Sequence, residues 1–255
     1  MTNPLFSLEG RTALITGSSR GLGLAIATGL AEAGARVVLN GVDGARLEVS
    51  AEALRARGHT VTAEAFDVTD EAAVNAAFAR LDAAGVAIDI LVNNAGIQLR
   101  KPLVEFEAEE WRRVIDTNLT SAFFVGREAA KRMIPRGRGK IVNIGSLMSA
   151  FARPTVAPYT AAKGGIKLLT QGMAAEWAEH GIQVNAIGPG YMLTDMNEAL
   201  TSNPQFDDWV KARTPSRRWG RPEELVGAAV FLSSAASDYV NGQIIYVDGG
   251  MSAVL

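Results

Sequence analysis

Tyr159 and Lys163 are the two side chains of this chain whose types and spacing most favour chemistry. On a helix, residues four apart lie on one face, so the phenol and the ammonium would be neighbours. A free tyrosine loses its proton near pH ~10, and a nearby cation favours the phenolate. The pair therefore predicts a phenol that exchanges protons closer to neutrality. An exposed pair on a surface helix is the alternative interpretation.

A glycine-rich turn near the N-terminus has the context of a dinucleotide-binding loop. Residues 16–23 follow a short strand-like run and open a helical pattern that contains Leu22, Ile26 and Leu30. Small residues let a backbone approach a pyrophosphate, and a helix N-terminus favours its negative charge. A plain tight turn is the alternative. The residues predicted to contact the cofactor here are Gly17, Ser19, Arg20, Gly21, Leu22 and Gly23.

The end of the second predicted strand indicates the type of cofactor. An acidic residue there would bind the adenosine ribose and repel a 2′-phosphate, but the predicted tip, Asn40 or Gly41, is uncharged. Arg20 would pair with a 2′-phosphate. Both features favour NADP(H), while Asp43 keeps NAD(H) open because a shifted turn would bring it to the ribose.

Strand-like and helical segments alternate along the whole chain. The predicted strands are residues 12–16, 37–40, 61–66, 88–92, 140–144, 182–187 and 243–247. Helical patterns occupy residues 44–57, 71–83, 111–115, 122–133 and 159–177. This alternation predicts an α/β fold with parallel strands and helices on both faces. Residues 192–221 break the rhythm, and we interpret them as a helical excursion that forms a substrate lid, with a passive connector as the alternative.

Composition narrows the class of protein. The 255 residues are 48% hydrophobic and 20% charged, with a net charge of −2 and no cysteine. These values suit one globular domain over residues 1–255, without a disulfide framework or thiolate metal site. They give no electrostatic case for nucleic acid. Residues 1–5 lack a signal-peptide pattern and no apolar run reaches a membrane span, so the expected location is the cytoplasm, with no membrane partner.

Further motifs occur in a fixed order along the chain. They are residues 16–23, Asp67-Val68, Asn93-Asn94-Ala95-Gly96, Asn118, Ser146, Tyr159 with Lys163, Pro189-Gly190 with Thr194, and Asp248-Gly249-Gly250. Over nearly its whole length, the chain resembles the short-chain dehydrogenase/reductases. The resemblance implies a nicotinamide-dependent oxidoreductase with a doubly wound (Rossmann) sheet of seven parallel strands, usually assembled as a homotetramer.

The family pattern also implies roles for individual residues. Tyr159 would be the proton donor or acceptor, and Lys163 would bind the nicotinamide ribose and tune the phenol. Ser146 would hydrogen-bond the reacting oxygen, and Asn118 would hold a water that links Lys163 to solvent. The remaining implied cofactor contacts are Asp67 and Val68 at the adenine, Asn94, Ala95 and Gly96 near the ribose, and Pro189, Gly190, Met192 and Thr194 at the carboxamide.

Within the family, the likeness is strongest to dehydrogenases of sugar acids. It rests on residues 5–8, 94–98, 213–220 and 247–251. A sugar acid needs a cation for its carboxylate and polar groups for its hydroxyls. Gln98, Arg100 and Tyr191 are therefore predicted substrate contacts, with Arg100 at the carboxylate. A solvated helix start is the alternative for Arg100 and Lys101, and Tyr191 and Trp219 either close the pocket or pack the lid.

Three other functions were weighed against this prediction. A 3-oxoacyl-acyl-carrier-protein reductase would need a basic patch, which Arg127, Lys131, Arg132, Arg136 and Arg138 offer. A redox-sensing binding protein would not need the Tyr159 and Lys163 pair. A serine hydrolase lacks its Gly-x-Ser-x-Gly elbow, and the two histidines are not at metal-ligand spacing, so no metal is predicted, although a hard cation on carboxylates stays open.

Overall fold

Seven apolar runs pair into one parallel sheet. The computed structural model describes residues 3–254. Its strands are β1 Thr12–Ile15, β2 Arg36–Gly41, β3 Val61–Ala65, β4 Ile90–Asn93, β5 Gly139–Ile144, β6 Ile182–Pro189 and β7 Ile244–Val247. They lie in the order β3-β2-β1-β4-β5-β6-β7, and every pairing is parallel. The predicted single-domain, doubly wound sheet is confirmed.

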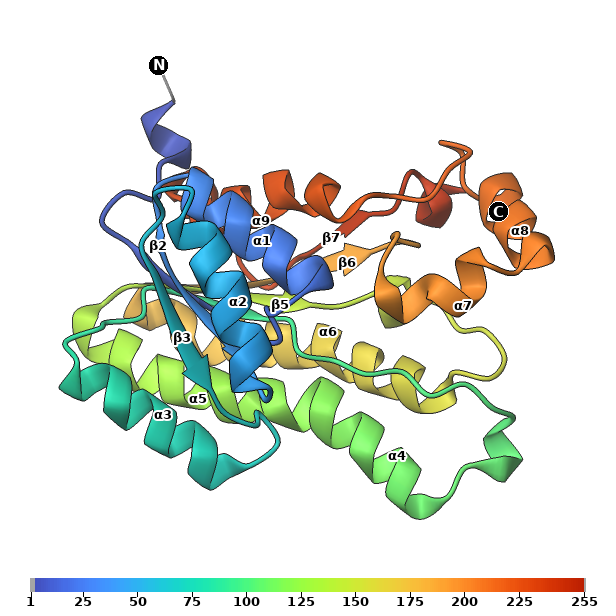
Figure 1. Cartoon of the computed structure of the whole chain (residues 1–255), viewed down its shortest axis with the longest axis horizontal. Helices are drawn as coiled ribbons and strands as arrows, with labels where there is room; N and C mark the ends of the chain where they lie inside the picture. Colours follow the sequence, from blue (N-terminus) through green and yellow to red (C-terminus); the bar gives the residue numbers. More distant parts are fainter. Residues whose placement is uncertain (1–2, 255) are drawn as a thin grey trace.

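Two layers of helices cover the sheet (Figure 1). On one face lie α1 Gly21–Glu32, α2 Gly44–Arg55 and α9 Val226–Ser233. On the other face lie α3 Glu71–Ala83, α4 Ala108–Ile115, α5 Ser121–Met133 and α6 Ala157–Trp177. Crossovers of one hand place α1 and α2 on one face and, after the strand order reverses, α4, α5 and α6 on the other. Helix α9 does not follow this pattern, because it connects β6 to β7 and packs against α1.

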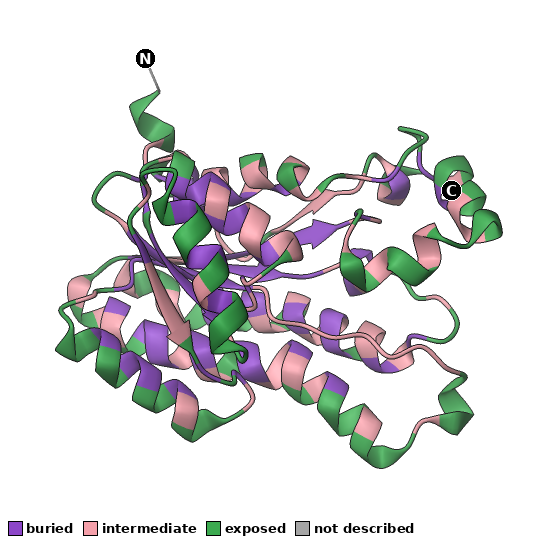
Figure 2. Cartoon of the chain, viewed as in Figure 1, coloured by how far each residue is buried: buried purple, intermediate pink, exposed green. Residues whose placement is uncertain are grey.

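Alternating strand residues supply two separate cores. Ile15 and Leu39 belong to the cluster beneath α1 and α9, whereas their neighbours Leu14 and Val38 belong to the cluster beneath α3 and α5. Side chains in a strand point to opposite faces in turn, so a sheet covered on both sides needs apolar residues at every position. Figure 2 shows the consequence, because the central strands are buried along their length and the exposed residues lie on the outward sides of the helices and in the loops.

The strand order reverses next to β1, and this reversal positions the site. The chain runs outward through β2 and β3, and β4 then returns to the other side of β1. The loops that leave β1 and β4 therefore diverge above the sheet and open a crevice at its carboxyl edge. Residues 16–23 follow β1 and residues 94–100 follow β4, so the two predicted binding segments face each other across this crevice.

Residues 192–221 form the predicted helical excursion. A short helical turn, Asp195–Asn197, leads into α7 Glu198–Thr201 and then α8 Pro204–Arg213, which stand beyond the carboxyl edge of the sheet (Figure 1). Trp209 of α8 is 45% exposed, whereas Trp219 is 6% exposed. Trp219 is buried because it packs against Tyr191 and Phe206 and its Nε1 donates to Asp207 at 2.8 Å.

In the part of the chain that the structure describes, every helix is too short or too polar to cross a bilayer.

Candidate active site

A single cleft at the carboxyl edge brings the predicted segments together. Its volume is about 1040 Å³, and its lining includes the glycine-rich turn, the loop after β4, Ser146, Tyr159 and the start of residues 192–221. The predicted catalytic residues Asn118, Ser146, Tyr159 and Lys163 all line it. So do all the predicted cofactor contacts and Gln98, Arg100 and Tyr191. Among residues 3–254, no three His, Asp or Glu side chains are grouped as a metal site would require.

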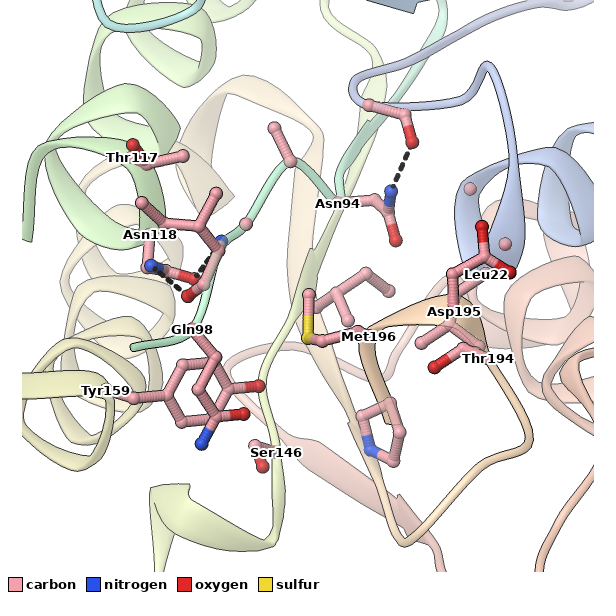
Figure 3. A pocket seen from close by; sticks show the side chains of 18 of the residues that line it. Leu22, Asn94, Gln98, Thr117, Asn118, Ser146, Tyr159, Thr194, Asp195 and Met196 are labelled. Atoms are coloured by element: carbon pink, nitrogen blue, oxygen red, sulfur yellow. Dashed lines mark hydrogen bonds between the residues drawn. The ribbon is translucent and has the colours of Figure 1, made fainter. Parts of the chain in front are cut away.

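Helix α6 presents Tyr159 and Lys163 to the cleft. The Lys163 ammonium lies 5.6 Å from the centre of the Tyr159 ring, and its Nζ donates to the carbonyl oxygen of Ile144 at 2.6 Å. The hydroxyl of Ser146 faces the phenol, and Figure 3 shows both on the same side of the pocket. Ser146 is itself held in place, since its Oγ accepts from the Met148 amide at 3.1 Å.

Burial dominates the electrostatics of the catalytic pair. It raises the pKa of Tyr159 above its ordinary value, and the hydrogen bond from Ser146 and the charge of Arg100 only partly oppose it. Burial also lowers the pKa of Lys163 to about 8. The expectation of a more acidic phenol is therefore wrong for the protein without ligand. The physical reason is that the low-dielectric site disfavours both charged forms, and Arg100 rather than Lys163 provides the favourable charge.

Asn118 shapes the loop after β4. It lies in a π-helical turn, Asp116–Thr120, between α4 and α5, which is a common arrangement at functional sites. Its Oδ1 accepts from the Ile97 amide at 3.2 Å, and its Nδ2 donates to the carbonyls of Ile97 and Val114 at 2.9 and 2.8 Å (Figure 3). All three bonds go to residues before Asn118, so its side chain does not cap the helix that follows.

Buried side chains hold the glycine-rich turn from both sides. Asn40 accepts from the Gly17 amide at 3.2 Å, while its Nδ2 donates to the carbonyls of Glu64 and Phe66. All three bonds go to backbone groups and Asn40 is 1% exposed. The Asn40 side chain thus fixes Gly17. Gly41, the other predicted end of the strand, also lines the cleft and is less buried.

Asn94 holds the same turn from the β4 side. Its Nδ2 donates to the carbonyls of Thr16 and Gly17 at 2.9 and 3.0 Å, and its amide donates to the Thr16 hydroxyl at 2.9 Å. The Ala95 amide shares that hydroxyl at 3.1 Å. Asn94 lines the cleft and joins the glycine-rich turn to the loop after β4.

The charged residues near the glycine-rich turn line the cleft and also make contacts within the protein. Arg20 lines the cleft but pairs with Asp195 at 3.0 Å, so it reaches across to residues 192–221. Asp43 caps α2 by accepting from the Arg46 amide at 3.1 Å, and the two side chains also pair at 3.6 Å. Asp67 accepts from Thr69 and shapes its own loop.

The end of β6 forms the opposite wall. Pro189 closes the strand, and the Gly190 amide donates to Val247 at 3.0 Å. Met192 is buried and pairs with Gly220 in an isolated bridge. Figure 3 shows Thr194 and Asp195 beside Leu22 of α1, so this wall meets the glycine-rich turn across the cleft.

Two arginines occupy the end of the cleft beyond Tyr159. Arg100 Nη2 lies 3.3 Å from Gln98 Oε1 and 3.3 Å from Asn197 Oδ1, and burial together with the charge of Arg153 lowers its pKa. Arg153 lines the same cleft, with its guanidinium 5.1 Å from the centre of the Phe206 ring. This end of the site is therefore positively charged, as the carboxylate prediction for Arg100 requires.

Comparison with known proteins agrees with this geometry. A family model described as enoyl-(acyl carrier protein) reductase matches residues 17–252. A gluconate 5-dehydrogenase of Gluconobacter oxydans is 53% identical over 100% of both chains. The crystal structure of a gluconate 5-dehydrogenase from Burkholderia cenocepacia in complex with NADP and tartrate is 50% identical, covers 99% of both chains and superposes with a TM-score of 0.97. The chain belongs to the short-chain dehydrogenase/reductase family.

A further relative supports the same placement. The 5-keto-D-gluconate 5-reductase of Escherichia coli strain K12 is 47% identical over 98% of both chains. The short-chain dehydrogenase/reductase family is NAD(P)-dependent, and the predicted family membership and class of cofactor are confirmed.

The cleft of this short-chain dehydrogenase/reductase fits such a dinucleotide. A Cβ at Gly23 would stand 2.4 Å from the Gly17 carbonyl oxygen, and Gly17 itself has a left-handed φ of 61°. Arg20 occupies the N-cap of α1 without a side-chain cap, which leaves the first amides of the helix to a ligand. Positions 17 and 23 therefore need glycine, because a larger side chain would not fit there. The free amides at the start of α1 suit a pyrophosphate bound to the backbone.

The sequence analysis missed several residues of the cleft. They are Arg46, Arg153, Asp195, Met196 and Asn197, all of which line it. Arg153 had a signal, because it is a lone cation in the apolar segment immediately before the catalytic helix. The others had none, since their proximity to the site depends on how residues 192–221 return to the sheet edge.

Proposed function

We propose that this protein is an NADP-dependent oxidoreductase that interconverts D-gluconate and 5-keto-D-gluconate. The observation that carries the proposal is the meeting of the Tyr159 phenol and Ser146 (Figure 3) with the cationic end formed by Arg100 in one cleft. Support also comes from full-length similarity to proteins named for this reaction.

The residues of the chain supply the acid-base half of the reaction. The nicotinamide supplies or accepts the hydride. Tyr159 gives its proton to the ketone oxygen on reduction, and Ser146 donates a second hydrogen bond that polarises the carbonyl. The raised pKa of Tyr159 keeps this proton in place at neutral pH. On oxidation Tyr159 takes the alcohol proton as phenolate, which the charge of Arg100 and the hydroxyl of Ser146 favour.

The polar end of the cleft suits a sugar acid. We assign the carboxylate to Arg100, whose guanidinium contacts only neutral oxygen atoms in the structure. Gln98 and Tyr191 line the same region and offer hydrogen bonds to the hydroxyl groups. An Arg100→Ala variant should raise KM for gluconate strongly, and an unchanged KM would exclude this role.

The structure gives little support to the alternative of a 3-oxoacyl-acyl-carrier-protein reductase, because its predicted basic patch is paired with carboxylates. Each of the five cations is paired with a carboxylate of this chain: Arg127 with Glu71 and Glu128, Lys131 with Glu128, Arg132 with Asp82 and Glu128, and Arg136 and Arg138 with Asp89. Neutralised cations offer little to an acidic carrier protein. A carrier-protein substrate is therefore disfavoured.

The preference for NADP rests on cations at the adenine end. Arg20 and Arg46 both line the cleft there and are more than half exposed. The competing Asp43 is engaged as the cap of α2. Bidentate arginine contacts would favour the additional phosphate of NADP. An Arg20→Ala/Arg46→Ala variant should weaken NADP binding and leave NAD binding nearly unchanged, and an equal loss for both cofactors would argue against this role.

A spectrophotometric assay tests the reaction itself. Gluconate, 5-ketogluconate and 2-dehydro-3-deoxygluconate should be run with both cofactors and with Tyr159→Phe. We expect turnover of the gluconate pair to fall by roughly two to four powers of ten in the variant, with cofactor binding retained. Oxidation should quicken as the pH rises, because it needs the phenolate. Tight cofactor binding without turnover of any carbonyl would support the dinucleotide-sensing alternative instead.

We infer that residues 192–221 close over the substrate. Tyr191 and Met196 line the cleft, and the pair of Arg20 with Asp195 joins this segment to the glycine-rich turn. Hydrogen exchange in residues 192–221 should slow when NADP and gluconate are both bound. An unchanged rate would leave the segment as a connector.

We also propose a cytoplasmic homotetramer. Phe123 on α5 and Leu168 on α6 are 42% and 67% exposed, and the edge strand β7 is only partly buried. Two separate apolar surfaces are what a tetramer with two kinds of two-fold contact needs. Light scattering coupled to gel filtration tests it, with Leu168→Asp expected to reduce the assembly to a dimer. A cytoplasmic location suits a dissociable cofactor that other enzymes must recycle.

A further inference from the structure

Two arginines share the substrate end of the cleft without a carboxylate partner among residues 3–254. Arg100 makes its contacts with Gln98 Oε1, Asn197 Oδ1 and the carbonyl of Met196 at 3.3, 3.3 and 3.4 Å. Its Nε is buried and has no hydrogen-bond partner. Arg153 has no ion pair within the same range of residues, and its one specific contact is with the ring of Phe206.

The backbone holds these two arginines close to each other. The amide of Lys101, the residue after Arg100, donates to the carbonyl of Thr155 at 3.1 Å. Thr155 adopts a left-handed φ of 72°, which is a genuine outlier for a β-branched residue. Strain of this kind persists where the surrounding structure requires it, and it is concentrated at functional sites. The turn that carries Arg153 is thus bonded to the segment that carries Arg100.

The side chain of Arg153 is positioned by the lid segment. Its guanidinium lies over Phe206 of α8 at 5.1 Å, and the Phe206 ring meets Tyr191 edge-on at 5.6 Å. Tyr191 lines the cleft as well. An anion held by Arg153 would therefore be linked, through the ring of Phe206, to helix α8 of the lid segment.

Two like charges in a partly buried site repel each other. Burial and then the charge of Arg153 lower the pKa of Arg100. Burial raises the pKa of Tyr191, and the charges of Arg153 and Arg100 partly oppose that rise. An anion between two such cations removes the repulsion and supplies the acceptor that they lack.

We propose that Arg153 is a second anion-binding residue that determines specificity: together with Arg100 it holds the carboxylate end of the substrate, and Phe206 keeps it in place. This inference rests on the proposed function, because that function is the reason for choosing gluconate as the ligand. It assigns polyhydroxy carboxylates as the preferred class over neutral polyols of equal length. It also makes Arg153 a link between anion recognition and the closure of residues 192–221.

The test compares one carboxylate with its neutral analogue. Binding of D-gluconate and of D-sorbitol to the NADP-loaded enzyme is measured by calorimetry for wild type, Arg153→Ala and Arg153→Lys. We expect wild type to prefer gluconate, Arg153→Ala to bind it about tenfold more weakly or worse, and sorbitol binding to stay the same. Arg153→Lys keeps the charge but not the planar fork, so it should recover only part of the affinity.

Two further variants separate positioning from charge. Phe206→Leu removes the ring beneath the guanidinium and should weaken gluconate binding by roughly threefold, with no effect on sorbitol. Arg112→Ala removes a cation that is 66% exposed on α4 and outside the cleft, so it serves as the matched control and should change neither ligand. In kinetics, Arg153→Ala should raise KM for gluconate while kcat stays within about threefold of wild type.

The outcomes separate this inference from the proposed reaction. If wild type binds gluconate no better than sorbitol, or if Arg153→Ala and Arg153→Lys both bind gluconate within about twofold of wild type, the anion role is overturned. If gluconate binding depends on Arg153 but no oxidation occurs with either cofactor, the reaction is misassigned and the anion site stands. Unfolding temperatures of the cofactor-loaded variants show that each is folded.

Discussion

The two walls of the cleft are built in contrasting ways. The cofactor wall, residues 16–23 with Asn40 and Asn94, is held by buried and part-buried hydrogen bonds between side chains and backbone, such as those of Asn40 with Gly17, Glu64 and Phe66. The lid wall, residues 192–221, packs around the buried Trp219, but its link to the cofactor wall is at the surface, in the pair of Arg20 with Asp195, whose side chains are both 63% exposed.

The difference matches what each wall must do. A dinucleotide presents the same phosphates in every turnover, and buried bonds in a low-dielectric site keep their acceptors and donors in one geometry. A substrate must enter and leave, and exposed ion pairs worth little free energy let a segment move. We conclude that the cofactor wall is preorganised and that the lid wall is adjustable.

The largest expected effect comes from one methyl group placed on each wall. In Gly23→Ala the new Cβ stands 2.4 Å from a backbone oxygen, that of Gly17, whereas in Gly220→Ala it stands 2.4 Å from the sulfur of Met192. A backbone atom cannot yield, but the end of a methionine side chain can. Gly23→Ala should weaken NADP binding about a hundredfold or more, and Gly220→Ala should leave it nearly unchanged. Equal losses by calorimetry would remove the distinction between the walls.

A matched pair of asparagines sharpens the comparison. Asn40→Ala leaves the Gly17 amide and the carbonyls of Glu64 and Phe66 without partners in a buried place, so it should lower the free energy of unfolding by about 3 kcal/mol. Asn197→Ala removes the half-buried bond to the Met192 carbonyl and should cost about 1 kcal/mol or less. Urea denaturation measures both, and a larger loss at Asn197 contradicts the assignment of rigidity to the cofactor wall.

Lys163 of α6, which lines the cleft, should lower the free energy of unfolding of the protein although its activity requires it. Burial lowers its pKa to about 8, so the unfolded chain holds this proton more tightly, and stability rises with pH between about 8 and the ordinary lysine value. Lys163→Met should stabilise the protein at pH 7 by about 1–2 kcal/mol, after allowing for the lost bond to the Ile144 carbonyl. The gain should vanish above pH 10, and turnover should be lost. A gain that does not depend on pH contradicts this explanation.

The smallest expected effect is at the bridge between the walls. Arg20→Ala and Asp195→Ala should each change the free energy of unfolding by less than about 0.5 kcal/mol, because the pair is exposed. Asp195→Ala should nevertheless strengthen NADP binding at low salt, since it frees Arg20, and this gain should fade as the ionic strength rises. Cofactor titrations at two salt concentrations measure it, and a loss of affinity would mean that Asp195 supports the site instead.

Much of the site was predictable because its parts are local. The glycine-rich turn, the strand ends and the four-residue spacing of Tyr159 and Lys163 depend on backbone geometry within a few residues, which amino-acid type reports directly. The predicted helix over residues 71–83 has the observed bounds, since Asp70 caps its first turn. The strand order next to β1 followed from the family resemblance and from the handedness of crossovers.

The electrostatics of the site were not predictable, because burial is a property of the whole fold. The spacing indicated that Lys163 would make the phenol more acidic, but enclosure by the sheet and by residues 192–221 raises the pKa of Tyr159 instead. The sequence likewise predicts that Asn40 is free at the end of its strand. In the structure its Nδ2 donates to the carbonyl of Phe66, and its Oδ1 accepts from the Gly17 amide.

The sequence by itself determined the fold class, from periodicity, and the class of cofactor, from the order of short motifs, and it predicts the catalytic side chains. Only the tertiary structure decided which charges are paired and which are free. It placed Arg153 and Asn197 beside Arg100 and paired the basic cluster of α5 with carboxylates. The physical reason is that a charge acts through space and dielectric, and residues distant in sequence set both.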